Sequence, residues 1–316
     1  MAASRLAGGA TLHGGGDINV SATVYRISIM KLEIAIFRLI SAFGIVWFHS
    51  EISRAKEIAY GGLIFFIIIS VNFAVISERP HGIFERAQRL LVPCCVWAIF
   101  YGAINIIFTG RLFPEGYSLF SSILSTPAIH LWFLPFIFFV LIVIDGIRPT
   151  LRNELINSLV GVSAIILILL SPIWREFNYI RPLGQYAQAL PAVLIGIFLS
   201  PYNKSKAWIL LLLGILATLI YMAAKQQPGI GIAYLAGTIP CYFLFSSREI
   251  TKHKSYILFA SSASLGVYLV HPFFLKVFRN LGIEGSWLAI TAFILSLTII
   301  MVFRKFAPNN IVKYVC

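Results

Sequence analysis

An arginine and a histidine stand eleven positions apart in the apolar stretch FRLISAFGIVWFHS, which covers residues 37–50. Eleven residues of α-helix make three turns plus about 20°, so Arg38 and His49 would share one helix face, about 16 Å apart. An imidazole with an ordinary pKa of about 6.5 can act as a general base or carry an acyl group. A charge within lipid is unfavourable, so Arg38 is expected to face protein, water or an anion. Alternatively, Arg38 reaches the lipid headgroups and His49 caps the helix.

A second pair of cations lies in FERAQRLLVPCCVW, where Arg86 and Arg89 are three positions apart and therefore neighbours on one helix face. Guanidinium groups bind phosphates through paired hydrogen bonds, so Arg38, Arg86 and Arg89 could form one anion site. The alternative interpretation of Arg86 and Arg89 is ordinary anchoring at the cytoplasmic face of the membrane.

Two further histidines stand in apolar stretches, His130 in AIHLWFLPF and His271 in SASLGVYLVHPFF. With His49 they are predicted to occupy the outer half of the membrane, as acceptor-binding residues or as structural hydrogen-bonding groups. Their spacing matches no local metal motif, so no metal site is expected. Trp132 and Tyr268 could stack on a sugar, or they could belong to an interfacial aromatic belt.

These residues require membrane helices to position them, and the composition predicts such helices. The chain has 316 residues, of which 59% are hydrophobic and only 12% charged, whereas soluble domains average about 25% charged residues. We therefore predict an all-α integral membrane bundle of about ten transmembrane helices. One of these predicted helices, segment 186–200, is short and is preceded by the polar residue Gln185. The predicted spans are 32–50, 58–77, 90–109, 129–146, 155–173, 186–200, 207–224, 229–246, 256–278 and 286–304.

The basic residues indicate the orientation of the bundle. With both termini in the cytoplasm, 17 of the 25 lysines and arginines fall on the cytoplasmic side, which agrees with the positive-inside tendency. This distribution accounts for the formal charge of +13 without nucleic acid as a partner. We predict a multi-pass protein of the bacterial inner membrane.

Three regions are predicted along the chain. Residues 1–29 are rich in Gly, Ala and small polar residues and are expected to form a disordered tail, with Met30 as the physiological start. Residues 30–306 would form the membrane domain, and residues 307–316 would form a short cytoplasmic tail. Acidic residues are few and none is placed deep in a span, which argues against a proton-coupled transporter.

Five sequence pieces resemble, in order, motifs of the membrane acyltransferase-3 family. RLISAFGIVWFH resembles its Arg-x10-His signature, GGLIFFIIISVNF its second-span block, and RAQRLLVP its Arg-x-x-Arg element. HLWFLP and SASLGVYLVHP resemble its His-x-Trp-Phe-Leu and Ser-x-x-x-Tyr-Leu-x-His elements. The resemblance covers residues 31–305. Two departures are the missing Asp before the FF pair and Asn72, which stands where small residues are usual.

The resemblance implies an O-acyltransferase that moves an acetyl or other short acyl group from cytoplasmic acyl-CoA to a hydroxyl of a glycan or lipid-linked sugar. It implies no permanently bound cofactor, with acetyl-CoA as donor substrate and exopolysaccharide or O-antigen among the acceptors. Arg38 and His49 carry over as catalytic positions, and Arg86 and Arg89 as the residues that bind the CoA phosphates. The alternative function is a transporter or flippase for lipid-linked sugars or acyl groups.

Overall fold

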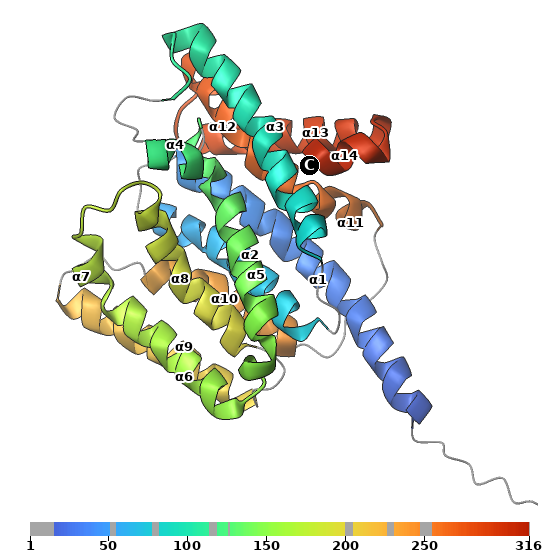
Figure 1. The fold of residues 1–316 in the computed structure, drawn as a ribbon, viewed down its shortest axis with the longest axis vertical. Coiled ribbons are helices and arrows are strands. Elements are labelled where there is room, and N and C mark those ends of the chain that lie inside the picture. The colour runs from blue at the N-terminus through green and yellow to red at the C-terminus, as the bar shows by residue number, and fades with distance from the viewer. Residues whose placement is uncertain are drawn as a thin grey trace, which may run out of the picture.

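The computed structural model describes residues 16–50, 55–77, 82–113, 119–125, 127–199, 205–225, 231–246 and 255–315. Within these ranges every regular element is a helix (Figure 1), so the predicted all-α fold class is confirmed. The elements are α1 (Gly16–Ser50), α2 (Ala55–Ile76), α3 (Ile83–Thr109), α4 (Leu119–Ser125), η1 (Ile129–Trp132), α5 (Phe133–Leu151), α6 (Glu154–Leu169), α7 (Ser171–Arg175), α8 (Leu183–Phe198), α9 (Ser205–Ala224), α10 (Gly231–Ser246), α11 (Ser255–Ser262), α12 (Ser264–Asn280), α13 (Gly285–Phe306) and α14 (Asn309–Val315).

Each of the ten predicted spans coincides with an apolar helix or with a bent pair of helices. In the described part of the chain, five helices are long and apolar enough to cross a membrane, and α11 with α12 would make a sixth span. The other four predicted spans contain shorter apolar helices, at Glu154–Leu169, Leu183–Phe198, Trp208–Ala224 and Gly231–Leu244. The protein is therefore a multi-pass membrane protein, and ten full crossings remain a prediction.

Helix α6 is one of the short apolar helices, and one of its faces is left uncovered. Its 16 residues span about 24 Å, less than the roughly 30 Å of a bilayer's hydrocarbon core. Leu155, Leu159, Val162 and Ile166 are all exposed, and their spacing places them on one side of the helix. This apolar stripe is suited to contact with lipid tails.

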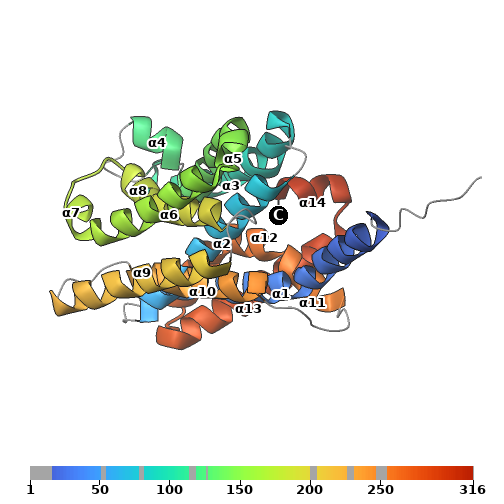
Figure 2. The same ribbon diagram turned by 90° about the horizontal axis from the view of Figure 1, so that it is seen from below.

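Helix α2 is the centre of the bundle, packed against α1, α5, α8 and α10. Seen from below, it lies between a layer containing α3, α5, α6 and α8 and a layer containing α1, α9, α10 and α13 (Figure 2). Two glycines of α2 permit close approaches. A Cβ atom at Gly62 would lie 2.3 Å from the Ser41 carbonyl oxygen of α1, and one at Gly61 would lie 2.7 Å from the Ala236 Cβ of α10. Small residues thus set the helix separation, as is common in membrane bundles.

Two buried asparagines bind the last turn of α8. The Asn72 side chain of α2 donates a hydrogen bond to the Gly196 carbonyl oxygen (3.3 Å), and Asn157 of α6 donates to the Ile197 carbonyl oxygen (3.1 Å). Carbonyls in the last turn of a helix lack partners within the helix, so these amides satisfy groups that lipid could not. Asn72 therefore joins α2 to α8.

The predicted span 256–278 is not one continuous helix. It breaks at Ala263, where the axes of α11 and α12 differ by 58°. Serine hydroxyls at the break donate to carbonyls three residues earlier, Ser261 to Leu258, Ser262 to Phe259 and Ser264 to Ser261. Such bonds compete with the helical backbone pattern and favour bending. The continuous helix expected from hydropathy was therefore wrong.

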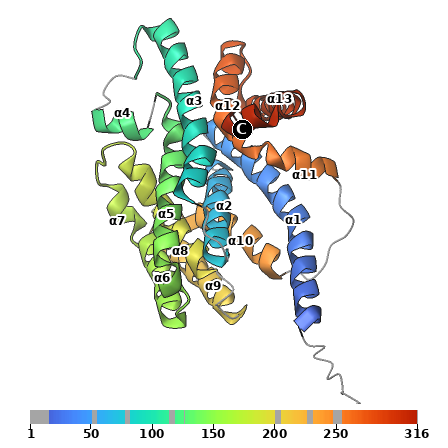
Figure 3. The ribbon, with the colours of Figure 1, turned by 45° about the vertical axis from the view of Figure 1, so that its right-hand side comes forward.

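Both predicted tails include residues that are helical in the structure. Helix α1 begins at Gly16, so residues 16–29 are helical here, and this end of α1 projects away from the bundle (Figure 3). The remaining part of the predicted tail, residues 1–15, lies outside the described residues. At the other end α14 packs on α3, where the Trp97 indole donates a hydrogen bond to the Val315 carbonyl oxygen (2.9 Å).

Candidate active site

Three histidines from separate elements meet in one cluster. His49 lies in the last turn of α1, His130 lies in η1 and His271 lies in α12. The ring centroids of His49 and His271 are 5.2 Å apart, and those of His130 and His271 are 5.8 Å apart. The sequence predicted that all three would lie in the same half of the membrane, and helix packing brings them into contact.

The surroundings of His271 define its protonation pattern. Its Nδ1 lies 2.7 Å from the Tyr268 carbonyl oxygen and 3.2 Å from the Val267 carbonyl oxygen, and the side chain is fully buried. Carbonyl oxygens only accept hydrogen bonds, so Nδ1 carries the proton of the neutral ring. Within the described residues, the buried Nε2 atoms of His271 and His130 have no hydrogen-bond partner. Nε2 of His271 therefore presents a lone pair within the cluster.

Two tyrosines hold the histidine-bearing segments together. The Tyr268 hydroxyl of α12 donates a hydrogen bond to the backbone carbonyl of His130, and the Tyr101 hydroxyl of α3 donates to the Leu269 carbonyl oxygen (2.8 Å). The Tyr101 ring also packs edge-on against His130, with centroids 4.9 Å apart. The sequence analysis did not select Tyr101. The feature that could have indicated it is the presence of a hydroxyl-bearing residue within the apolar third span.

The cluster opens onto a cavity of about 250 Å³, here called the histidine pocket. It contains four predicted site residues, His49, His130, Trp132 and Tyr268, whereas His271 stands behind them. The exposed part of His49 faces this pocket and a second one of about 400 Å³, here called the basic pocket. The sequence analysis assigned no role to three other residues of the histidine pocket, Tyr60, Gln185 and Gln188.

Arg38 lies in the partly buried part of α1, close enough to Arg304 of α13 for their charges to repel. Within the described chain, neither arginine has a carboxylate partner, and the Nε atom of Arg304 is buried without a hydrogen bond. His49 contacts α12 through His271, and the shared helix face of Arg38 and His49 stays a prediction. Two adjacent cations without a counter-charge form a site suited to an anion.

Arg86 and Arg89 do not share such a site. Arg86 is buried and forms a salt bridge with Asp145 of α5 (2.7 Å), whose other oxygen contacts Arg148. Arg89 is exposed and pairs with Glu85 (2.6 Å). Each of the two therefore already faces a carboxylate, and their binding of CoA phosphates stays a prediction.

The sequence analysis placed no acidic residue deep in a span and gave Asp145 no role, whereas Asp145 lies toward the end of α5 and bridges two arginines. The sequence feature that could have indicated this pairing is the position of Arg148, three residues after Asp145 on the same helix face. The Arg148 guanidinium also donates to the Ser77 carbonyl oxygen (2.8 Å), which attaches α5 to the end of α2.

The bundle and its histidine cluster define a multi-pass membrane enzyme with its candidate active site among the helices. A family model described as an acyltransferase domain matches residues 31–305. The chain therefore belongs to the acyltransferase-3 family and is a membrane acyltransferase. Comparison with curated proteins and with solved structures gave no match.

Proposed function

We propose that this acyltransferase moves an acetyl or other short acyl group from cytoplasmic acyl-CoA to a hydroxyl of an extracytoplasmic or lipid-linked glycan in the bacterial inner membrane. The observation that carries the proposal is that one helix, α1, brings Arg38 to an uncompensated cationic site and His49 to a histidine-lined pocket. An acyl-CoA donor carries anionic phosphates at one end and a reactive thioester at the other. Its two ends would fit the cationic site and the histidine pocket, respectively.

The donor's phosphates bind at Arg38 and Arg304 in this proposal. Arg38 and His49 are separated by about 16 Å along α1, a length of the same order as an extended pantetheine arm. A thioester bound in this way would reach from the cationic site to the histidine pocket. Arg86 and Arg89 would support the head of the donor from the neighbouring helix, if the carboxylates that now face them give way to phosphate.

The transfer step needs one base in the histidine pocket. Nε2 or Nδ1 of His49 accepts the proton of the acceptor hydroxyl as its oxygen attacks the thioester carbonyl. The carbon–sulfur bond then breaks, and the proton passes from the imidazole to the departing CoA thiolate. His49 suits this role because its exposed surface faces both pockets at the cluster.

The other two histidines position His49 and the acceptor. His271 lies against the His49 ring with its Nε2 lone pair available, so it can accept a hydrogen bond from the imidazolium that forms. His130, Trp132 and Tyr268 line the pocket and would contact the acceptor sugar, with the aromatic rings against its C–H faces.

The test uses the full chain purified into lipid nanodiscs, with radiolabelled acetyl-CoA and the surface glycan of a strain that lacks the gene. We expect O-acetyl groups on the glycan by NMR, and about a 100-fold or larger loss with His49→Asn. Unchanged acetylation by His49→Asn would remove this residue from the chemistry. Movement of lipid-linked sugars across vesicles without consumption of acetyl-CoA would contradict the enzyme proposal and favour a flippase.

A further inference from the structure

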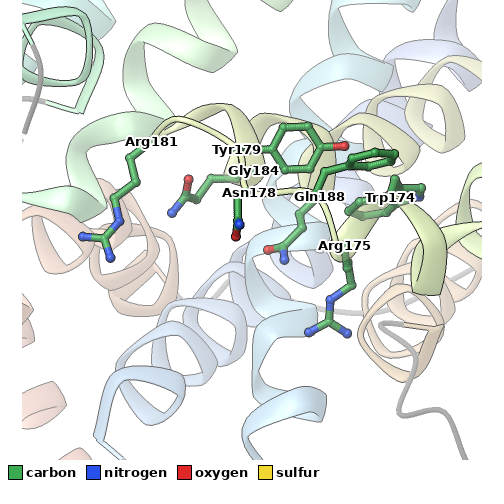
Figure 4. A pocket seen from close by; sticks show the side chains of 9 residues that line it. Trp174, Arg175, Asn178, Tyr179, Arg181, Gly184 and Gln188 are labelled. Carbon is green, nitrogen blue, oxygen red and sulfur yellow. The ribbon is translucent and has the colours of Figure 1, made fainter.

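A third pocket adjoins the histidine pocket and has a different chemical character. Its volume is about 310 Å³, within the range of about 300–1,000 Å³ typical of small-molecule sites. It is formed by α7, the segment that follows it and the first turns of α8 (Figure 4). Because Arg175 and Arg181 line it, we call it the arginine pocket.

The arginine pocket and the histidine pocket share a wall. Gln185 and Gln188 of α8 line both. A ligand held by the arginines could therefore place a neighbouring part of the same molecule beside His49.

The side chains of this pocket match the groups of an acidic sugar. Figure 4 shows Arg175 and Arg181 at opposite ends, with Asn178 and Gln188 between them. Guanidinium groups bind carboxylates through paired hydrogen bonds, and amides can both donate to and accept from sugar hydroxyls. Trp174 supplies an aromatic surface, and its indole is held by a hydrogen bond to the Leu167 carbonyl oxygen (2.8 Å).

The basic pocket also adjoins the histidine cluster. It shares His49 and His130 with the histidine pocket and is also lined by Lys276 and Arg279 of α12. The histidine pocket thus shares lining residues with two pockets that both carry cations. A polymer with repeated negative charge fits this arrangement better than a neutral one, because both ends of a bound segment would meet a cation.

We propose that the arginine pocket binds a carboxylate-bearing sugar residue of the acceptor glycan, so that the next sugar presents its hydroxyl to His49. The proposal rests on the proposed function and names its acceptor class as an acidic glycan of the uronate type. The diphosphate of a lipid carrier would also attract the arginines. The amides and the aromatic ring favour the sugar, since they match hydroxyls and C–H faces that a diphosphate lacks.

The experiment compares acceptors that differ only in charge. The full chain in nanodiscs is given acetyl-CoA with hexamers of galacturonate, glucuronate or mannuronate, and with the same hexamers after reduction of their carboxyl groups. We expect at least one uronate to be acetylated with a KM lower by about tenfold or more than its reduced form. Arg175→Gln/Arg181→Gln should abolish that difference while leaving the KM for acetyl-CoA unchanged. Arg152→Gln, an exposed arginine at the end of α5, is the matched control and should behave as wild type.

Binding of the same hexamers without acetyl-CoA, measured by calorimetry, separates this proposal from the proposed function. If uronates bind through the two arginines but no acetyl group is transferred to any acceptor, the acceptor site stands and the catalytic proposal fails. If no uronate binds or reacts better than its reduced form, the acidic-glycan proposal is overturned. It is also overturned if the double variant loses only acceptors linked to a lipid diphosphate, because the pocket then recognises the carrier.

Discussion

The His49 and His271 rings lie 5.2 Å apart between centroids, with an angle of 39° between their planes, although α1 and α12 are at opposite ends of the sequence. His271 is held by backbone carbonyls through Nδ1, so only its Nε2 is free to act on its neighbour. This relationship makes His271 a candidate positioning residue for the base.

The roles of the two nitrogens of His271 can be separated by substitution. An asparagine at 271 can keep the donor to the Tyr268 carbonyl oxygen but lacks the Nε2 lone pair. We expect His271→Asn to fold normally and to lower kcat about tenfold or more, with the pH dependence of kcat displaced because the His49 imidazolium loses its acceptor. Rates across pH 5–9 and circular dichroism would check this. Wild-type kcat and pH profile in His271→Asn would show that the ring is structural only.

The cationic pair of Arg38 and Arg304 gives a prediction about the donor. Arg38→Gln and Arg304→Gln should each raise the KM for acetyl-CoA about tenfold or more, because each removes a charge-assisted contact with phosphate. The same variants should use acetyl-pantetheine, which has no phosphate, as well as the wild type does. Steady-state rates with the two donors give the answer, and an equal loss with both would place the arginines elsewhere in the mechanism.

The bridge from Asp145 to Arg86 and Arg148 should matter more for stability than the pair of Arg89 and Glu85. Asp145→Asn leaves two buried guanidinium groups without a carboxylate and should destabilise the protein by about 3–5 kcal/mol. Glu85→Gln breaks an exposed pair and should cost about 0–1 kcal/mol. Thermal unfolding of both variants in the same detergent compares them. Equal loss of stability would mean that the buried bridge is not specially important.

The glycines of α2 and α5 form a second matched pair. Gly62→Ala should destabilise the bundle by about 1–3 kcal/mol or more, since its Cβ atom would meet the Ser41 carbonyl oxygen at 2.3 Å. A Cβ atom at Gly146 would meet nothing within 4 Å, and Gly146→Ala should be neutral or stabilising by up to about 1 kcal/mol. The yield of monodisperse protein and its unfolding temperature measure both effects, and tolerance of alanine at Gly62 would contradict the close packing of α1 and α2.

Hydropathy predicted the positions of the helices well, because about 20 consecutive apolar residues have few other uses. Helical periodicity also predicted that Arg38 and His49 would share a face. The break at Ala263 escaped prediction because serine hydroxyls that bond to the backbone hardly alter hydropathy. The neighbours of Arg38 and Arg86 escaped it for another reason: the proximity of Arg304 to Arg38 and the salt bridge between Arg86 and Asp145 depend on tertiary packing.

The arginine pocket was not predicted at all. The sequence analysis assigned no role to Arg175 or Arg181. Loop residues follow no helical period, so the sequence does not indicate which of them converge. By contrast, Trp132 and Tyr268 were selected as sugar-contacting residues and do line the histidine pocket, where their contact with a sugar remains a prediction.

The short length of α6 has a consequence for the lipid around the protein. A helix of about 24 Å with an exposed apolar stripe is shorter than a hydrocarbon layer of about 30 Å, and local thinning of the bilayer is one way in which a membrane accommodates such a helix. The two membrane surfaces would then approach each other where this helix meets the lipid. Membrane thickness therefore becomes a variable to which the activity of this enzyme should respond.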